Sequence, residues 1–342
     1  MPKPSLTKHL NYFADALSFL KTVTWRKLLN SIKLTISYLY STATKQLWVN
    51  GLPTTTTIEP TTLCNLKCPE CPSGNGQLRR RKGNMAMKVY DHSIDQIKKT
   101  TIWLLLYFQG EPFLHPELFQ LIEKARRNNL YTILSTNGHF LNTTNCERII
   151  QSGLNRIIIS LDGTEEETYS QYRKNGDFQR VTEGIKQLVK TKKSMKARAP
   201  LIILQFLVFR HNQDQVKSIK ELGKSLGVDN VQVKSAQIYN FRKKTEKIPT
   251  KTKHSRYSFK SNNEPELKSE LNNKCRRLWY TTVITADGEV VPCCFDKQAD
   301  YTIGNLMQNP FQKIWKNDAY KNFRKKLLTS RREISICKNC TE

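Results

Sequence analysis

The chain is 342 residues long, and its 56 Lys and Arg residues outnumber its 29 Asp and Glu residues, which gives a formal net charge of +27. A hydrophobic fraction of 38% suits a soluble globular protein, and no run approaches the roughly 18 apolar residues of a membrane span, which excludes an integral membrane protein. Such a positive surface attracts polyanions, unless the basic residues are spread evenly over solvated faces.

Residues 1–50 are expected to be helical. Apolar residues recur there at helical spacing in two sets: Leu10, Phe13, Leu17 and Leu20, then Leu28, Ile32, Ile36 and Leu39. Seven Lys and Arg residues accompany a single acidic residue, Asp15, which interrupts the apolar stretch, and no signal peptide is predicted. We therefore expect a cytoplasmic protein in which this segment either contacts an anionic membrane surface peripherally or packs on the domain that follows.

Residues 51–240 alternate between β-rich runs and helical patterns. The strand candidates are 54–60, 101–108, 130–136, 155–162, 200–209 and 228–235. Segments such as 116–129 and 212–227 are long enough for crossover helices between parallel strands. Six such units fall short of the eight of a closed barrel, so the predicted fold is α/β, a partial (β/α)6 TIM-like barrel with its site at the carboxyl ends of the strands.

Residues 241–273 are polar and almost free of core-type residues, and they are expected to form a linker or mobile loop. A small domain, 274–342, follows with five of the nine cysteines, and Asp287-Gly288 joins two β-rich runs in it, which predicts a β-hairpin. Nine cysteines in a reducing compartment indicate metal binding or chemistry before disulfides. One of them, Cys146, is expected to be a buried helix residue.

Three cysteines, Cys64, Cys68 and Cys71, follow the first strand candidate within eight positions. Their charged neighbours and two prolines indicate an irregular polar loop rather than a packed strand. A structural zinc site usually has four ligands, and the loop offers no fourth Cys or His. Three thiolates suit an iron–sulfur cluster in which each binds a different iron, so that one iron stays open to a small molecule.

The spacing CxxxCxxC resembles the signature of the radical S-adenosylmethionine (SAM) enzymes, and three motifs that follow successive strands support the resemblance. "FQGEPFLHP" (108–116) is similar to the family's GGEP motif, although Gln109 replaces the first glycine, and "LSTNG" (134–138) and "ISLDG" (159–163) resemble two further segments of the family. The resemblance implies a [4Fe–4S] cluster at the three cysteines, with SAM at its open iron. It also implies cofactor-binding roles for Gly110, Glu111, Pro112, Ser135, Asn137, Ser160, Asp162 and Arg173.

The C-terminal cysteines resemble those of the auxiliary-cluster extensions called SPASM and twitch. The resemblance implies one auxiliary [4Fe–4S] cluster held by Cys275, Cys293, Cys337 and Cys340, with Cys294 as an uncertain fifth cysteine. The pattern departs from full SPASM domains, which continue with more cysteines, because the chain ends two residues after Cys340. A structural zinc site with four cysteine ligands is the alternative.

The resemblance implies reductive cleavage of SAM to a 5′-deoxyadenosyl radical, which abstracts hydrogen from a substrate, with a reductase or flavodoxin-type protein as the electron donor. The net charge of +27 and the basic run Arg79–Lys82 favour an anionic sugar or lipid-type metabolite, and Asp296 is a candidate general base for its oxidation. A peptide substrate is the alternative.

Two hypotheses from other classes stay open at this stage. The first is a metal-stabilised nucleic-acid-binding protein, which the absence of aromatic-rich basic motifs makes a weak candidate for a nucleic-acid partner. The second is a membrane-bound scaffold without activity, against which the three intact cysteines argue.

Overall fold

The computed structural model describes residues 6–341, and their contacts divide them into two compact units. One unit combines the chain up to Phe19 with Cys64–Gln77 and Ile133–Lys268. The other combines Leu20–Leu63 with Leu78–Thr132 and the chain from Ser269 onward. The three-cysteine loop therefore belongs to the first unit, called here the loop unit, and the five C-terminal cysteines belong to the second, called the hairpin unit.

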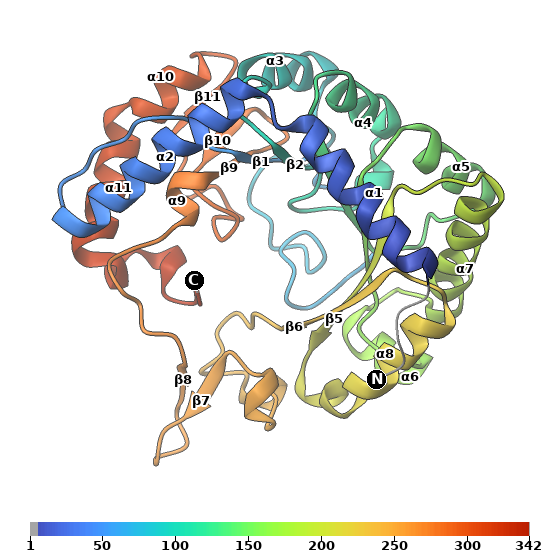
Figure 1. The fold of residues 1–342 in the computed structure, drawn as a ribbon. Coiled ribbons are helices and arrows are strands. Elements are labelled where there is room, and N and C mark those ends of the chain that lie inside the picture. Colours follow the sequence, from blue (N-terminus) through green and yellow to red (C-terminus); the bar gives the residue numbers. More distant parts are fainter. Residues whose placement is uncertain (1–5, 342) are drawn as a thin grey trace. The chain divides into compact units, whose positions relative to one another are not determined.

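The loop unit is built on a parallel sheet. Its strands, in sheet order, are β3 (Tyr131–Thr136), β4 (Arg156–Ser160), β5 (Leu201–Val208) and β6 (Asn230–Ser235). The helices that alternate with them along the chain are α5 (Thr143–Gln151), α6 (Glu166–Tyr172), α7 (Phe178–Ser194) and α8 (Val216–Ser225) (Figure 1). Ile157, Ile158 and Ile159 of β4 are all buried, as a strand covered on both faces requires.

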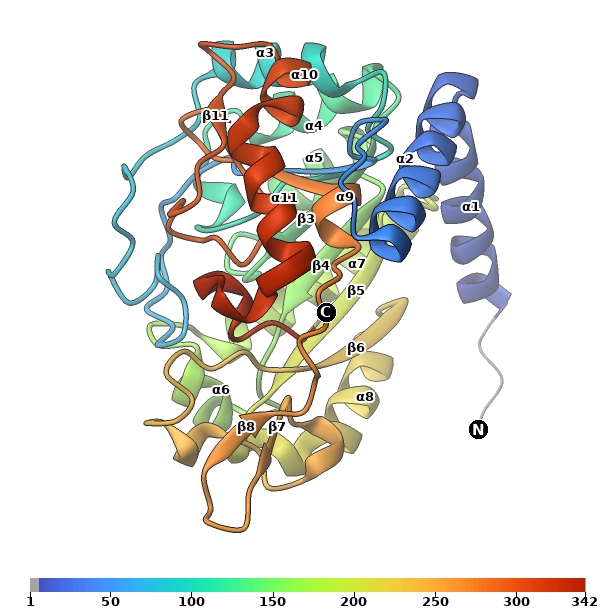
Figure 2. The ribbon, with the colours of Figure 1, turned by 90° about the vertical axis from the view of Figure 1, so that its left-hand side faces the viewer.

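The hairpin unit contains a mixed sheet. Its strands, in sheet order, are β11 (Gly304–Asn305), β10 (Glu289–Val291), β9 (Thr281–Ile284), β1 (Thr55–Ile58) and β2 (Trp103–Leu105). β1 pairs in parallel with both β2 and β9, whereas β10 runs antiparallel to β9 and β11. Its main helices are α3 (Met87–Ile97), α4 (Leu118–Arg127), α9 (Arg277–Tyr280), α10 (Phe311–Lys316) and α11 (Asp318–Ser330), and Figure 2 shows the last of these clearly.

The sequence predictions agree with this architecture in most respects. Each of the six predicted strands is present within its predicted range, so the α/β class with parallel strands is confirmed, and these strands with the helices between them agree with a partial TIM-like barrel. The hairpin is confirmed as β9 and β10, and Gly288 in its turn adopts a φ of +79°, which favours glycine. Cys146 is fully buried in α5, as predicted.

The N-terminal helices are also confirmed as α1 (Leu6–Thr22) and α2 (Trp25–Thr44). The Thr24 side chain caps α2 by accepting a hydrogen bond from the Lys27 amide, and Lys45 ends the helix in the left-handed conformation. No helix among residues 6–341 is both long enough and apolar enough to cross a membrane.

Residues 241–273, expected to form a linker or mobile loop, contain short elements of secondary structure. They contain two short turns, η3 (Thr245–Lys247) and η4 (Thr252–His254), and a small hairpin, β7 (Tyr257–Phe259) with β8 (Pro265–Leu267). The reason is that two large side chains anchor the segment, because Ile248 and Tyr257 are both buried. Phe241 and Leu267 pack against the same cluster of buried side chains, so a few well-placed apolar residues order a stretch whose average composition is polar.

Candidate functional site

The three-cysteine loop folds by local hydrogen bonds and one obligatory glycine. The Cys71 amide donates to the Cys68 carbonyl at 3.1 Å, and the Asn75 amide donates to the Cys71 carbonyl at 2.9 Å. A β-carbon placed on Gly74 would lie 2.7 Å from the Cys68 nitrogen, so only glycine lets the chain turn back on itself here. Cys68 is 4% exposed, while Cys64 and Cys71 are half-buried.

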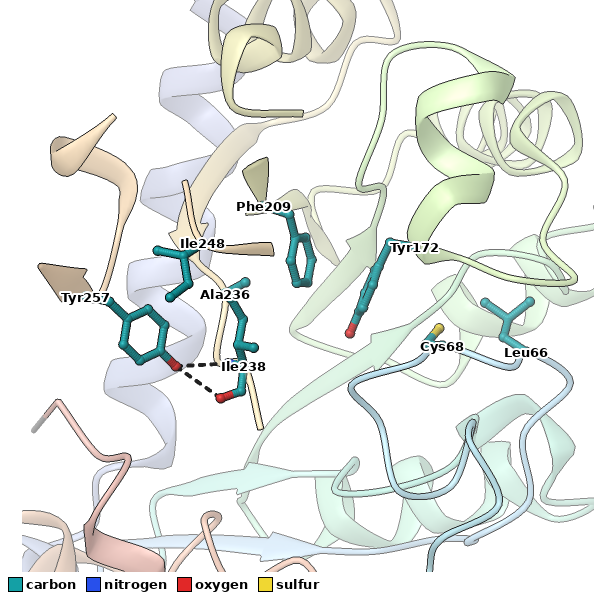
Figure 3. Close-up of a cluster of buried hydrophobic side chains, with 8 residues drawn as sticks. All are labelled: Leu66, Cys68, Tyr172, Phe209, Ala236, Ile238, Ile248 and Tyr257. Carbon is teal, nitrogen blue, oxygen red and sulfur yellow. Dashed lines mark hydrogen bonds between the residues drawn. The ribbon is translucent and has the colours of Figure 1, made fainter. Parts of the chain in front are cut away.

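Cys68 packs into an apolar cluster of the loop unit (Figure 3). Tyr172 at the end of α6 lies beside it and packs against Phe209, with ring centroids 4.3 Å apart and the ring planes tilted by 37°. The members of the cluster are Leu66, Cys68, Tyr172, Phe209, Ala236, Ile238, Ile248 and Tyr257. The segment expected to be a linker therefore contributes two residues to the wall behind the cysteine loop.

Arg173 and Asp162 form a buried pair next to Cys68. The Arg173 Nε donates to Asp162 Oδ2 at 2.6 Å, and Asp162 Oδ1 accepts from the Leu207 amide at 2.7 Å. The Arg173 Nη1 lies 3.9 Å from the Cys68 sulfur. Burial raises the pKa of the Cys68 thiol, and the Arg173 charge opposes that shift. Burial also lowers the pKa of Arg173, but the negative charges of Asp162 and Cys68 outweigh it and keep the guanidinium charged.

Asp162, for which the resemblance implies a cofactor-binding role, has its side chain engaged within the loop unit. The residue is fully buried, and Leu207 and Arg173 occupy its two carboxylate oxygens. Its carbonyl oxygen accepts a further hydrogen bond from Asn212 Nδ2 at 2.9 Å. Asp162 therefore fixes the orientation of Arg173, which is the charged group that lies next to the cysteine loop.

Asn137 also reaches the cysteine loop. Its Nδ2 donates to Asn65 Oδ1 at 2.8 Å, and its Oδ1 lies 3.0 Å from His139 Nδ1. Because His139 Nε2 accepts a hydrogen bond from the Asp177 amide at 2.9 Å, the ring proton is on Nδ1 and points to Asn137. Burial lowers the pKa of His139, in agreement with a neutral ring. His139 was not predicted; it orients Asn137.

The two predicted serines lie on the strands themselves. Ser135 is a half-buried residue of β3 and pairs with Ile158 of β4. Ser160 ends β4 opposite Gln205 of β5 and is 7% exposed. Both serines therefore belong to the loop unit, together with the cysteine loop.

Glu70, within the cysteine motif, is a site residue that the sequence did not indicate. It is 4% exposed, and its carboxylate accepts hydrogen bonds from Lys244 Nζ at 2.8 Å, Lys247 Nζ at 2.6 Å and the Tyr239 amide at 2.8 Å. Burial raises its pKa, but these three donors outweigh burial and the pKa is lowered. The ion pairs fasten the cysteine loop to residues 239–247. A charged residue between two closely spaced cysteines is the only signal in the sequence.

Gly110, Glu111 and Pro112 lie together in the hairpin unit, after β2. Gly110 adopts a φ of +74°, and a β-carbon there would lie 2.4 Å from the Thr61 carbonyl oxygen. The Glu111 amide donates to the Leu63 carbonyl at 2.7 Å, and Pro112 begins the short helix η1 (Pro112–Leu114). The motif is therefore locked against the segment that leads into Cys64.

The basic run that favoured an anionic substrate is largely neutralised within the hairpin unit. Both terminal nitrogens of Arg80 donate to the fully buried Glu59 at 2.8 Å. Exposed ion pairs at 2.6 Å join Arg79 to Asp300 and Arg81 to Asp287. These arginines stabilise the loop that contains them, so the run no longer supports the expected substrate charge.

Three of the C-terminal cysteines, Cys275, Cys337 and Cys340, lie near Arg331. Its Nη2 lies 3.5 Å from the Cys340 sulfur, and its Nη1 donates to the Lys274 carbonyl at 2.7 Å. Burial raises the pKa of Cys293, and negative charge on neighbouring thiols, first Cys294 and then Cys275 and Cys337, raises it further. Cys340 in turn interacts electrostatically with Cys275 and Cys337, so these two cysteines lie near both Cys293 and Cys340.

No three His, Cys, Asp or Glu side chains in the described part of the chain are close enough to share a single metal ion. A [4Fe–4S] cluster does not require that convergence, because each thiolate binds a different iron. The chemistry of both donor sets, thiols with one arginine beside them, fits such a cluster. Cys294 has a different arginine beside it, since Arg277 Nη1 lies 3.6 Å from its sulfur.

Asp296, the candidate general base, shapes the loop after the hairpin. It is fully buried, and its two oxygens accept hydrogen bonds from the amides of Asp300 at 2.8 Å and Tyr301 at 2.9 Å. Burial raises its pKa, and these two amides oppose the shift. It is therefore not the solvent-exposed carboxylate that a turn would offer.

Comparisons with known proteins agree with both cysteine sets. The radical SAM superfamily model matches residues 58–221, and the model described as an iron–sulfur cluster-binding domain, SPASM, matches residues 275–341. The fold is similar to that of BtrN in complex with AdoMet and 2-DOIA, with a TM-score of 0.55 and 20% identity over 86% of this chain and 95% of that chain.

Two further solved structures share the fold. Streptococcus suis SuiB bound to S-adenosylmethionine has a TM-score of 0.63 at 14% identity, over 86% of this chain and 73% of that chain. Native anSMEcpe with bound AdoMet has a TM-score of 0.60 at 18% identity, over 79% of this chain and 82% of that chain. The cluster and SAM are the cofactors that these domains imply. The chain belongs to the radical SAM superfamily and carries a C-terminal SPASM iron–sulfur cluster-binding domain.

Proposed function

We propose that this radical SAM enzyme abstracts a hydrogen atom from an anionic sugar- or lipid-type metabolite and oxidises it. The observation that carries the proposal is the cysteine loop with its fixed cation, in which Arg173, held by Asp162, lies 3.9 Å from the Cys68 sulfur. When bound, the [4Fe–4S] cluster and SAM supply an electron and a 5′-deoxyadenosyl radical for hydrogen abstraction, and the auxiliary cluster supplies an acceptor for the second electron.

In this proposal Cys64, Cys68 and Cys71 hold the first cluster. Arg173 provides positive charge for the SAM carboxylate, and Asp162 positions it rather than touching the cofactor. Asn137 provides a polar group at the same loop, with its orientation fixed by His139. Asp162, Asn137 and His139 are buried, and the hydrogen bonds that orient Arg173 and Asn137 are already made, so binding would cost little reordering.

In the hairpin unit we assign Gly110, Glu111 and Pro112 to the SAM amino group through their backbone. A glycine is needed because any side chain at position 110 would displace Thr61. Ser135 and Ser160 in the loop unit are proposed to line the cofactor.

Four cysteines, Cys275, Cys293, Cys337 and Cys340, are proposed to hold the auxiliary cluster, and Arg331 balances its negative charge. Asp296 remains the candidate base for the proton that leaves the substrate. An Asp296→Asn variant with an unchanged melting temperature and a lost substrate oxidation would support that role, whereas loss of folding would leave only the loop-shaping role.

The proposed substrate class rests on the net charge of +27, since the arginines of the basic run are paired within the hairpin unit. A peptide substrate is the second candidate, because similar structures include SuiB bound to precursor peptide SuiA and anSMEcpe bound to the Cp18Cys peptide. BtrN in complex with AdoMet and 2-DOIA is a similar structure with a bound small molecule, as the first candidate requires. The same positive charge suits an acidic flavodoxin-type protein as the electron donor.

The test is anaerobic cleavage of SAM with dithionite, followed by chromatography of 5′-deoxyadenosine. We expect cleavage in the wild type and none in a Cys64/Cys68/Cys71→Ala variant. Cleavage should stay at the wild-type level in Cys146→Ala, because Cys146 is a buried cysteine that belongs to neither ligand set. Equal cleavage by the triple variant would refute the proposal. Stimulation of SAM cleavage by anionic metabolites but not by peptides would support the proposed substrate class. Stimulation by peptides but not by anionic metabolites would favour the peptide alternative.

A further inference from the structure

Helix α2 presents its polar side to the protein and its apolar side to solvent. The buried positions of the helix are Lys27, Asn30, Leu34, Ser37 and Ser41, which follow one another at three- and four-residue spacing. Four of these five are polar, and Lys27 is 1% exposed. A helix on a soluble protein normally buries the opposite side, with its apolar residues against the core.

The buried polar side is held by hydrogen bonds within the hairpin unit. Lys27 Nζ donates to the Asn129 carbonyl at 2.6 Å. Asn30 accepts from the Leu52 amide at 2.9 Å and donates to its carbonyl at 2.8 Å. Ser37 and Ser41 both donate to the Trp48 carbonyl, at 2.6 and 2.8 Å. The orientation of α2 is therefore fixed by specific contacts, and the apolar side cannot turn inward without breaking them.

The outward side of α2 is a continuous apolar row, called here the α2 row. Its members and their exposed fractions are Trp25 (69%), Leu28 (43%), Ile32 (47%), Ile36 (52%) and Leu39 (58%). A spacing of three or four residues places all five on one side of the helix. This is a contiguous apolar surface on a single helix, which singly exposed hydrophobic residues do not make.

Helix α1 shows the same inversion within the loop unit. Its polar residues point inward, where Asn11 Nδ2 donates to Asp229 at 2.7 Å and Asp15 pairs with Arg156 at 2.5 Å. Its large exposed apolar residues include Leu10, Phe13 and Leu17, with exposed fractions from 41% to 63%, and Leu20, beyond the part of the helix assigned to this unit, is 62% exposed. Two successive helices therefore expose apolar side chains, which indicates that this part of the chain binds an apolar environment.

Charge indicates which apolar environment this is. Among residues 9–50, the exposed Lys and Arg side chains are Lys21, Arg26, Lys33 and Lys45, whereas the only acidic residue, Asp15, is buried. Arg26 and Lys33 are seven residues apart and lie along one flank of the α2 row. An apolar row with basic residues at its edge complements an anionic bilayer, in which acyl chains take the apolar side and headgroups take the cations.

We propose that the α2 row binds the surface of an anionic lipid bilayer, with the helix lying in the plane of the interface. Trp25 at the start of the helix suits the headgroup boundary, since its ring is apolar and its N–H is polar. The row lacks polar side chains that would fix the register of a protein partner, so a bilayer fits it better than a second protein does. The proposal is independent of the radical SAM chemistry.

The test is co-sedimentation of the full chain with vesicles of phosphatidylcholine alone or with about 30% phosphatidylglycerol. We expect binding to the anionic vesicles, and a loss of about tenfold or more in an Ile32→Glu/Ile36→Glu variant. Met307→Glu is the matched control, because Met307 is 42% exposed in the same unit and lies outside the row. An Arg26→Gln/Lys33→Gln variant should lose binding about tenfold or more on anionic vesicles only.

A second readout locates the helix in the bilayer. Quenching by brominated lipid should fall when Trp25→Phe removes the indole of the row, whereas the fully buried Trp279 should not contribute. Equal binding by the Ile32/Ile36 variant and the Met307 control, at wild-type melting temperature, would overturn the proposal. So would a dimer in light scattering that the Ile32/Ile36 variant dissociates, since that result would assign the row to a second copy of the chain.

Discussion

Substitution of Gly74 by alanine tests whether the cysteine loop is the first cluster site. The new methyl would lie 2.7 Å from the Cys68 nitrogen, where ordinary contact begins at 3.4 Å, so the backbone of Cys68 must move by about 0.7 Å. The neighbour is backbone and cannot rotate away. Metal–ligand distances tolerate only about 0.2 Å, so a shift of this size at one thiolate should prevent cluster binding.

Gly76→Ala is a matched control in the same loop. Gly76 has a φ of +76° with no atom within 4 Å of the added methyl, so alanine there brings backbone strain without a collision. The expected cost is about 1 kcal/mol of local stability, in a loop that is already exposed. The pair of variants separates displacement of Cys68 from a general weakening of the loop.

The assay is iron and sulfide content after anaerobic reconstitution. With two [4Fe–4S] clusters we expect about eight irons in the wild type and in Gly76→Ala, and about four in Gly74→Ala, as in the variant without the three loop cysteines. Circular dichroism should show the same helix content in all of them. Full iron content in Gly74→Ala would mean that Cys68 does not hold a cluster at this position, and equal losses in both glycine variants would mean that loop strain, not the position of Cys68, decides loading.

Three further outcomes follow from the buried charges. Arg173→Lys should retain iron but raise the KM for SAM about tenfold or more, and Asp162→Asn should do the same if it acts only by positioning Arg173; a change in kcat alone would contradict this. Glu70→Gln should lower the free energy of unfolding in urea by about 1–3 kcal/mol and speed proteolysis of residues 239–268. An unchanged free energy and an unchanged proteolysis rate would mean that the ion pairs do not stabilise the loop. Burial lowers the pKa of Lys27 from 10.5 to about 8, so the folded state binds that proton more weakly than the unfolded state does. The free energy of unfolding of the wild type, relative to that of Lys27→Met, should therefore rise by about 2 kcal/mol from pH 8 to pH 10. A difference that does not change with pH would refute the pKa shift.

The parts of the candidate site that could be predicted from the sequence are those that lie in short contiguous motifs. The three cysteines come after β1, Gly110 comes after β2, Asn137 follows β3 and Ser160 ends β4, so each lies at or beyond the carboxyl end of its strand. The structure adds why glycine stands at position 110, where any side chain would meet Thr61. It does not change which residues were expected.

The supporting contacts could not be predicted, because they join residues far apart in the chain. Glu70 is bound by Lys244 and Lys247, more than 170 residues away, in a segment whose composition indicated a linker. Arg80 stood in a basic run that suggested substrate binding, but its partner Glu59 is fully buried 21 residues earlier. Composition counts charges without showing which of them are paired.

Helix α2 shows the same limit in another form. Apolar periodicity predicted the helix correctly, yet it cannot say whether the apolar side faces a core, a partner or a lipid, because all three give the same spacing. The deciding information lies on the other side of the helix, where Lys27, Asn30 and Ser37 are bound to backbone groups. Burying a lysine is unfavourable, as its lowered pKa shows. The fold nevertheless keeps this arrangement and leaves Trp25 and Ile36 exposed. Binding of the α2 row to a lipid bilayer would explain both features, because it would remove these side chains from water.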